Sequence, residues 1–580
     1  MTHRGSAGAT PAERTTPTAR STRAGNRTPT GPIPVPQRTP TDPTPAEGTT
    51  AAALGSDLRR AYADALPGAR AAILSRLWGA LTREPIAGVT GVTRDGGDLT
   101  VTLTGGRRLR GAGDAARPFA VAPAGLALTL DGTPYDHPTP LLAALGLPGH
   151  ADRLCAELDE SVANLALARA AQPVLDGGPP MLERLARMTP QAATALAEQL
   201  VVDGHPLHPC CRTRRGLSTA DVLAYAPEHR PVVELAVVEV PADRWVSTGT
   251  GLPPRLLMHP WQRDHVLPGH PGLVVSAETV PARPLMSLRT LAPVGDPAWH
   301  VKTAVDVQMT SAVRTVSDAA LHNGPVLSAL LGRLVAGTRG LDLLTEVAAG
   351  AVVVDGAPSR SLAMVRRRAP RPTGGDVVVP LAALTARSPA DGRPLVCEAV
   401  TLGYPDRPVD LFADLVHLLF PATTTLLHLG VALEAHGQNM CVVLRRGRPV
   451  GLFYRDLGGV RVSPRRLAAA GVAAPPLRGD LVSDDPDVLR TKLAAALLGG
   501  VVSELVAVLA REYDLPPARL WRAADTALAG AYAALPDAAR ADGLALRTGP
   551  WPLKATTAMR LADDPLTDRW TLHDNPLEAR

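Results

Sequence analysis

Lysine, aromatic residues and regularly spaced cysteines are all scarce in this chain. Only three of its 60 basic residues are lysines, namely Lys302, Lys492 and Lys554. Aromatic residues make up 3% of the sequence and do not interleave with a basic helix, so no nucleic-acid partner is predicted. The five cysteines follow no regular spacing, and their odd number argues against a disulfide framework and favours a reducing compartment.

Long uninterrupted hydrophobic runs are also missing. The longest candidate, residues 493–510, is interrupted by Ser503 and Glu504 and is typical of an amphipathic core helix rather than a membrane span. The basic N-terminal segment has no hydrophobic region after it, so it is not a secretory signal. We therefore expect a cytoplasmic protein without membrane contact.

Composition and periodicity divide the chain into an arm and three domains. Residues 1–50 hold nine prolines and thirteen threonines and should be disordered. Residues 51–171 combine helical patterns with a short strand, 172–395 alternate helices with strands, and 396–580 are mainly helical around one hairpin. The sequence therefore predicts a multi-domain α+β fold.

A predicted hairpin in the second domain carries two cationic side chains. Its strands cover 284–291 and 301–308, with a turn cluster at 293–297 between them. If the strands pair, Arg289 and Lys302 are presented from the same sheet.

The segment after this hairpin adds hydroxyls and a further guanidinium. Thr310 and Ser311 are expected to cap a helix that carries Arg314 in its first turn. Several cations with a hydroxyl suit a polyphosphate, whose charge needs directed donors. A solvated basic face is the alternative, and the scarcity of lysine favours the phosphate site.

The third predicted domain contains a dense polar cluster. A helix is expected over 422–435 and a hairpin over 441–455. Around them lie oxygen ligands of the kind that Mg²⁺ accepts and a histidine that can donate to a phosphate. The residues concerned are Glu434, His436, Gln438, Asn439 and Asp456. A plain helix C-cap is the alternative interpretation.

A histidine-proline loop precedes both clusters. His205 and His208 are followed by the basic residues Arg212 and Arg214, which suit carboxylate recognition. A zinc site is disfavoured here, because two adjacent cysteines do not easily share one tetrahedral ion.

Taken in order, these segments resemble the IucA/IucC family, the siderophore synthetases that work without nonribosomal peptide machinery. The resemblance spans roughly residues 200–460 and leaves 1–50 outside it. The residues that carry it are His205-Pro-Leu-His208-Pro with Arg214 and Gly216, His259-Pro-Trp-Gln262, Ser287-Leu-Arg289-Thr290, Lys302 with Thr310 to Arg314, and Glu434-Ala-His436-Gly-Gln-Asn439 with Arg455-Asp456.

The resemblance implies a hand-like fold and an AMP-forming ligase reaction. Residues 51–171 would form the thumb, 172–395 the fingers with an antiparallel sheet, and 396–580 a mainly helical palm, in a homodimer. Such enzymes use ATP and Mg²⁺ to adenylate a carboxylate of citrate or of a citrate or succinyl derivative. They then pass the acyl group to an amine, hydroxylamine or alcohol.

The resemblance also implies roles for individual residues. Phosphates would be bound by Ser287, Arg289, Thr290, Lys302, Arg314 and His436. Lys302, Arg314 and His436 would act in catalysis, and Asn439 and Asp456, with Glu434 as a further oxygen ligand, would hold the metal. His205, His208, Arg212 and Arg214 would meet the carboxylate substrate. One departure is Arg212, which stands where the family has a lysine.

Two other functions stay open from the sequence. A kinase-like phosphotransferase would use Asn439 and Asp456 for Mg²⁺, but Gln438 cannot act as a general base and no glycine-rich loop precedes Lys302. A catalytically degenerate relative that only binds carboxylates is the other alternative, which the set of charged residues disfavours.

Overall fold

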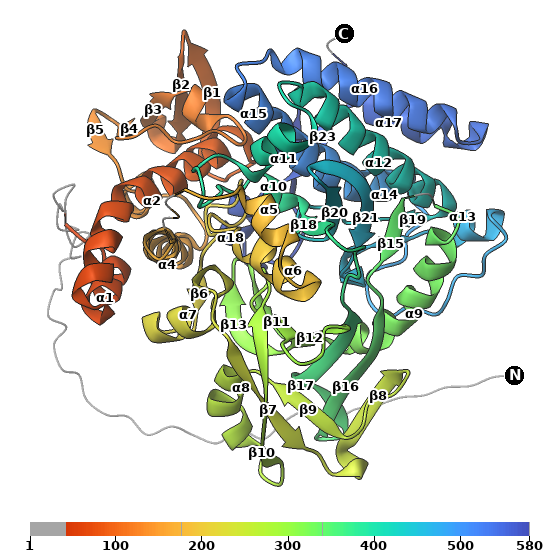
Figure 1. Cartoon of the computed structure of the whole chain (residues 1–580). Coiled ribbons are helices and arrows are strands. Elements are labelled where there is room, and N and C mark those ends of the chain that lie inside the picture. The colour runs from red at the N-terminus through yellow and green to blue at the C-terminus, as the bar shows by residue number, and fades with distance from the viewer. Residues whose placement is uncertain (1–41, 174, 176, 339, 579–580) are drawn as a thin grey trace, which may run out of the picture. The chain divides into compact units, whose positions relative to one another are not determined.

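The N-terminal part of the chain packs two long helices against a small antiparallel sheet. In this computed structural model, which describes residues 42–173, 175, 177–338 and 340–578, α2 (Ser56–Arg83) packs along α4 (Ala151–Ala170) (Figure 1). The sheet consists of β1 (Val89–Asp95), β2 (Asp98–Leu103), β3 (Arg108–Ala112), β4 (Leu128–Leu130) and β5 (Thr133–Tyr135). The helical patterns and the short strand predicted for residues 51–171 are confirmed.

A short helix before α2 corrects the predicted extent of the disordered arm. Residues 1–41 lie outside the described residues, but α1 (Pro45–Ala53) is helical. Glu47 of α1 is buried, and it accepts hydrogen bonds from Arg70 of α2 and pairs with His137 at 3.2 Å. Burial raises the pKa of Glu47, but these two partners outweigh it and lower the pKa to about 2. Residues 45–50 therefore belong to the folded body.

An eight-stranded antiparallel sheet forms the middle of the chain. Its spatial order is β8-β16-β17-β12-β11-β10-β7-β9. The strands are β7 (Val233–Glu239), β8 (Trp245–Gly249), β9 (Arg255–Met258), β10 (Val274–Pro284), β11 (Thr290–Pro293), β12 (Trp299–Thr303), β16 (Glu346–Val354) and β17 (Ala357–Arg368). β11 pairs with β12 and places Thr290 opposite Lys302, which confirms that the two segments pair. The predicted strand 284–291 is wrong in its middle, because residues 285–289 form the turn between β10 and β11.

The chain leaves this sheet at Ala304, which the sequence did not indicate. The predicted strand 301–308 is in fact two strands, because β13 (Val305–Met309) joins a separate sheet with β14 (Ala312–Arg314) and β6 (Arg214–Arg215). Thr310 adopts a left-handed φ of 59° in the turn between β13 and β14. The predicted helix cap at Thr310 and Ser311 is therefore wrong, and Arg314 lies on a strand.

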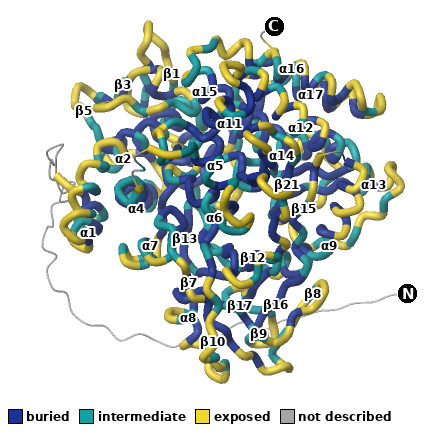
Figure 2. The backbone as a smooth tube through the Cα atoms, viewed as in Figure 1, coloured by how far each residue is buried: buried dark blue, intermediate teal, exposed yellow. Residues whose placement is uncertain are grey.

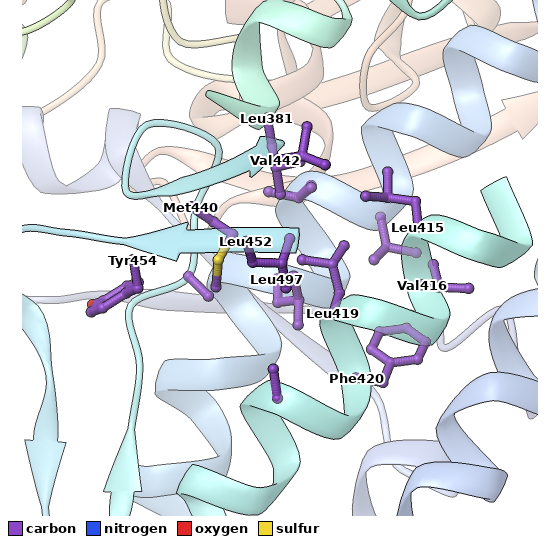
Figure 3. Close-up of a cluster of buried hydrophobic side chains, with 14 of the residues drawn as sticks. Leu381, Leu415, Val416, Leu419, Phe420, Met440, Val442, Leu452, Tyr454 and Leu497 are labelled. Carbon is purple, nitrogen blue, oxygen red and sulfur yellow. The ribbon is translucent and has the colours of Figure 1, made fainter. Parts of the chain in front are cut away.

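In the C-terminal part, a β-hairpin packs against helices. β20 (Met440–Arg445) and β21 (Arg448–Tyr454) confirm the predicted hairpin. Helix α12 (Pro408–Leu429) is longer than expected and ends earlier, because Gly430 adopts a left-handed φ of 109°; the predicted helix end at His436 is wrong. Figure 3 shows Leu419 and Phe420 of α12 in one buried cluster with Leu452 of β21 and Leu497.

One long helix of this part changes its winding. Pro486–Glu512 begins as α14 (Pro486–Leu493), continues as a π-helical segment (Ala494–Val502) and ends as α15 (Ser503–Glu512). A π-helix has i→i+5 hydrogen bonds and wider turns, and such segments often occur at functional sites.

The remaining elements complete the body around these layers. The other helices are α3 (Pro138–Leu145), α5 (Met181–Ala186), α6 (Pro190–Gln199), α7 (Thr219–Tyr225), α8 (Pro260–His265), α9 (Asp318–Val335), α10 (Leu381–Leu384), α11 (Leu395–Gly403), α13 (Pro464–Ala469), α16 (Pro517–Ala533), α17 (Arg540–Thr548) and α18 (Thr556–Leu561). The other strands are β15 (Leu341–Leu343), β18 (Val377–Pro380), β19 (Val431–Ala432), β22 (Arg461–Val462), β23 (Trp551–Lys554) and β24 (Trp570–His573).

Within the described part of the chain, two helices have the length and apolar composition of a membrane span. They are α12 and the continuous helix Pro486–Glu512. In each, more than half of the most apolar window is buried inside the structure, 56% and 61% respectively, as is common for core helices. Figure 2 shows buried backbone along much of α12 and α14.

The contacts of Glu47 predict where the N-terminus can be shortened. Deletion of residues 1–42 leaves α1 intact, whereas deletion of 1–50 removes the carboxylate that Arg70 and His137 share. We expect the longer deletion to lower the free energy of unfolding by roughly 3–5 kcal/mol, as for a broken buried ion pair. Thermal unfolding of both truncated proteins beside the full chain measures this, and equal midpoints would contradict the role given to Glu47.

Candidate active site

The β11–β12 hairpin brings together the first predicted phosphate-binding residues. Ser287 Oγ donates to Thr290 Oγ1 at 2.9 Å, and Thr290 lies opposite Lys302. Arg289 Nη1 donates to the Thr315 carbonyl at 2.6 Å, while its Nε has no partner among the described residues. Ser287 and Arg289 therefore lie in the turn between β10 and β11, and Thr290 and Lys302 lie on the central strands β11 and β12.

Lys302 forms an ion pair with the C-terminal part of the chain. Its Nζ lies 2.6 Å from Asp456 Oδ1 and 3.9 Å from Glu346 Oε1. Burial by itself would raise the pKa of Asp456, but the charges of Lys302, Arg367 and Arg289 hold it well below its usual range. Asp456 is therefore ionised at neutral pH, and it directly joins the end of β21 to the cationic hairpin.

The loop between β19 and β20 is fixed by hydrogen bonds to its own backbone. Asn439 is buried and its Nδ2 donates to the Glu434 carbonyl at 3.2 Å. The Arg455 amide donates to the Asn439 carbonyl at 3.1 Å. Because Arg455 precedes Asp456, this bond holds Asn439 beside the acidic residue, as the predicted metal site requires.

Lys492 is a residue of this region that the sequence did not single out. Its Nζ lies 3.1 Å from Glu434 Oε1, and its side chain is 9% exposed. Gly459 permits the approach of Glu434, since a Cβ there would lie 1.8 Å from Glu434 Oε2. The scarcity of lysine was the available signal, because Lys302 and Lys492 both pair with predicted metal ligands.

Arg314 extends from β14 towards the same cations. Its Nη2 donates to the Met309 carbonyl at 3.0 Å. Burial and the charge of Arg289 lower the pKa of Arg314 to about 10, although Asp456 acts in the opposite direction. The guanidinium therefore stays charged at neutral pH and lies within electrostatic reach of Arg289 and Asp456.

Three predicted site histidines share one hydrogen-bond pattern. In His205, His208 and His436, Nδ1 accepts from the backbone amide two residues later, at 3.2, 3.0 and 3.2 Å. This fixes the tautomer, so that Nε2 carries the proton and donates. His208 Nε2 lies 2.8 Å from Ser311 Oγ, whereas Nε2 of His205 and of His436 has no hydrogen-bond partner in the described part of the chain.

Two of these histidines influence each other across the chain. Burial lowers the pKa of His205, and the nearby His436 and Arg76 lower it further. Burial also lowers the pKa of His436, although Glu434 and Asp456 oppose the shift. Both rings are therefore neutral at pH 7, and each offers an N–H group at the same site.

Arg212 and Arg214 do not reach the substrate side as predicted. Both guanidiniums are buried on the Glu228 carboxylate, at 3.4 and 2.7 Å. Arg212 Nε also donates to the Val202 carbonyl at 2.8 Å. The prediction of direct substrate contact is therefore corrected, because these arginines hold the histidine-proline loop from within.

Two further buried ion pairs tie the motif segments to the rest of the body. Arg455, next to Asp456, donates to Glu198 of α6 at 2.9 Å. Arg560 of α18 donates to Glu157 of α4 at 2.7 Å and to the Ser311 carbonyl at 2.9 Å. Sequence reasoning missed these partners, which lie 257 and 403 residues apart in the chain.

The oxygen atoms present fit a magnesium ion that is shared with phosphates. Asn439 and Asp456 carry hard oxygens on segments that the Arg455–Asn439 backbone bond joins, and Asp456 pairs with Lys302 as Glu434 does with Lys492. Among the described residues there is no group of three or more His, Cys, Asp or Glu that could hold a metal ion. Such a sparse set suits Mg²⁺, which usually takes one or two carboxylates and leaves the rest to water and phosphate.

Comparison with known families matches both halves of this site. The IucA/IucC family model matches residues 193–251 and 255–386, and a model described as ferric iron reductase FhuF-like transporter matches 411–566. Staphyloferrin A synthase of Staphylococcus aureus is 28% identical over 352 residues, which is 53% of this chain and 60% of that protein's length. D-ornithine–citrate ligase of the same species is 29% identical over 177 residues, 24% of this chain and 27% of that protein.

Solved structures share the fold over most of the chain. The petrobactin biosynthesis protein AsbB of Bacillus anthracis has a TM-score of 0.75 at 18% identity, covering 91% of this chain and 98% of that protein. ATP-bound aerobactin synthetase IucA of Klebsiella pneumoniae has a TM-score of 0.70 at 18% identity, covering 89% and 100%. The fold is thus that of siderophore-synthetase structures. Residues 193–251 and 255–386 are similar in sequence to the IucA/IucC family.

Removal of the Glu228 charge should destabilise the fold without touching the site surface. Burial raises the pKa of Glu228, but Arg212 and Arg214 outweigh it and hold the pKa well below the usual range. The resulting stabilisation is present above the ordinary pKa of about 4.5 and is lost as the pH falls towards the folded-state value.

We expect Glu228→Gln to cost roughly 3–5 kcal/mol near neutral pH, because two buried guanidiniums lose their counter-charge. Urea unfolding at neutral and acidic pH measures this, with the exposed Glu234→Gln as the matched control. A Glu228→Gln protein as stable as that control would contradict the structural role of the pair.

Proposed function

We propose that this protein is an AMP-forming siderophore ligase. It adenylates a carboxylate of citrate, or of a citrate or succinyl derivative, with ATP, releases pyrophosphate and transfers the acyl group to an amine, hydroxylamine or alcohol. The observation that carries the proposal is the ion pair between Lys302 and Asp456, which brings the cationic hairpin to Asn439 and Asp456.

The cationic residues suit the phosphates of ATP. Attack of a carboxylate on the α-phosphorus builds negative charge on non-bridging oxygens, and preorganised cations stabilise it. Arg289, Lys302 and Arg314 supply the charges, and the Ser287 and Thr290 hydroxyls supply short-range donors. Bound Mg²⁺, held by Asn439 and Asp456, would neutralise further phosphate charge.

The neutral histidines suit the acyl substrate and its oxyanion. His205 and His436 offer Nε2–H donors from opposite segments, and His208 orients the Ser311 hydroxyl beside them. Because these rings are neutral, each donates a hydrogen bond to a carboxylate without transferring a proton to it. Positioning the acid against ATP in this way can supply much of the rate.

A pair of cavities provides room for the nucleoside. One of about 530 Å³ is lined by Asp342, Thr345 and Phe453, and an adjoining one of about 500 Å³ by Thr345 and Glu346. Glu346 lies 3.9 Å from Lys302, so the cavities begin beside the proposed phosphate site. We assign the adenosine to this groove.

Three further properties belong to the same proposal. We propose that residues 51–171, 172–395 and 396–580 act as thumb, fingers and palm. We also propose that the enzyme works as a cytoplasmic homodimer on small molecules. The similarity to staphyloferrin A synthase supports a related reaction. Because the alignment covers only 60% of that protein's length, the substrates are left to be assigned.

Nucleotide product analysis tests the reaction class. Purified protein is incubated with ATP, Mg²⁺, citrate and excess hydroxylamine, and we expect AMP, pyrophosphate and a citryl hydroxamate. ADP would instead establish a phosphotransferase, and no turnover across a panel of carboxylates would identify a relative that only binds them.

Replacement of Lys302 tests the site within the same assay. We expect Lys302→Ala to lower turnover by about 10²–10³-fold, since a preorganised charge on the phosphates is lost. The exposed Arg360→Ala on the same large sheet serves as the matched control. Full activity of a folded Lys302→Ala protein would remove the assignment.

A further inference from the structure

Glu504 is a carboxylate near the proposed acyl site whose charge no neighbouring cation neutralises. It lies at the start of α15, directly after the π-helical segment, and is partly exposed. Its Oε1 accepts a hydrogen bond from Thr385 Oγ1 at 2.8 Å. Within the described residues no Lys, Arg or His nitrogen lies within 4.0 Å of it, the distance that defines the ion pairs of this structure.

Four other carboxylates of this region are engaged. Each forms an ion pair with a basic side chain, with nitrogen–oxygen distances of 2.5–3.1 Å. The pairs are Asp203 with Arg169, Glu434 with Lys492, Asp456 with Lys302, and Glu157 with Arg560. Glu504 is therefore the one acidic group of this set that remains open to a cationic ligand.

Two contacts connect Glu504 with the proposed acyl site. Thr385 belongs to the turn after α10, and the Ala382 amide of α10 donates to the Gly437 carbonyl at 2.9 Å, next to His436. Arg76 of α2 lies close enough for its charge to lower the pKa of Glu504, and its Nη1 donates to the Asp203 carbonyl at 3.2 Å, in the loop that carries His205. Glu504 is thus linked to both segments that supply the free histidine donors.

The winding of the helix explains how Glu504 comes to this place. Lys492 and Glu504 are 12 residues apart, which is about 3.3 turns of a regular α-helix, so the two side chains would point in different directions. The wider turns of Ala494–Val502 take more residues each and reduce that rotation. In this one helix, Lys492 near the N-terminal end pairs with Glu434, and Glu504 beyond the π-helical segment accepts a hydrogen bond from Thr385.

We propose that Glu504 binds the protonated amine of the acyl acceptor and takes up its proton. This inference rests on the proposed ligase function and extends it to the second substrate, a primary alkylamine. The acyl site is otherwise formed by the neutral His205 and His436 beside the cations Lys302 and Arg314, which cannot bind an ammonium group through opposite charge. A cationic acceptor therefore needs an unpaired carboxylate, and Glu504 supplies it.

The transfer step balances with Glu504 as the proton acceptor. The carboxylate takes one proton from the ammonium, and the free electron pair on nitrogen attacks the carbonyl carbon of the acyl adenylate. The C–O bond to the phosphate then breaks, AMP leaves with the bonding electrons, and the second nitrogen proton passes to solvent as the amide forms. No redox partner is required.

The charges around Glu504 suit this role. Burial raises the pKa of Glu504 to about 7, and the Thr385 hydroxyl and the charges of Arg76 and Arg511 lower it only in part. A general base works best when its pKa lies near the working pH. Because the base form is needed, amine transfer should rise as the pH increases through this value.

The test compares uncharged and cationic acyl acceptors in the Glu504→Gln variant. This substitution keeps a side-chain oxygen that can accept the hydrogen bond from Thr385. ATP–pyrophosphate exchange with citrate reports the first half-reaction, and hydroxylamine, uncharged at neutral pH, reports transfer without an ammonium. Ethylenediamine, 1,4-diaminobutane and ornithine report transfer to a cationic amine. Glu512→Gln, on the same helix and paired with Arg511, is the control.

We expect Glu504→Gln to keep exchange and hydroxamate formation while kcat/KM for the diamines falls by about 100-fold. The rise of amine transfer relative to hydroxylamine transfer across about pH 6–8 should also disappear. Equal losses with both acceptors, or unchanged diamine transfer, would overturn the inference and leave the ligase proposal standing. Absence of exchange and of AMP formation in the wild-type protein would overturn both.

Discussion

The ion pair between Lys302 and Asp456 is the constraint on which the proposed site depends. Lys302 comes from the middle of the eight-stranded sheet and Asp456 from the end of a hairpin that packs on the C-terminal helices. Neither charge can be buried alone at reasonable cost. The pair therefore fixes the central strands and the β10–β11 turn, with Ser287, Arg289 and Thr290, against the loop that contains His436 and Asn439.

Around this pair, some polar side chains form buried ion pairs that stabilise the fold, and others keep atoms free to bind a substrate. Arg212, Arg214 and Arg455 are buried on carboxylates and set the positions of the histidine-proline loop and of β21. His205, His436 and Glu504 keep polar atoms without a charged partner among the described residues. The first group stabilises, and the second group is where substrate recognition is expected.

Local patterns predicted those parts of the site that depend on one hairpin or one loop. The turn cluster at 293–297 was sufficient to predict that the segments carrying Thr290 and Lys302 pair, and the polar density after 434 marked the Asn439–Asp456 cluster. Period-two alternation failed at Ser287 and Arg289, because these residues lie in a turn. Arg212 could not be assigned correctly, because Glu228 captures it only after the chain has folded. Glu504 had no signal in the sequence, since a π-helical segment sets its direction relative to Lys492 and sequence periodicity does not reveal it.

The most direct test of the central claim follows an oxygen atom through the reaction. Citrate labelled with ¹⁸O in its carboxylates is incubated with the full-length protein, ATP, Mg²⁺ and an acceptor amine, and the phosphate products are analysed by mass spectrometry. Adenylation at the Lys302–Asp456 junction predicts that one label passes from the carboxylate to AMP. Label in inorganic phosphate together with ADP, or product formed without any transfer of label to AMP, would contradict the account.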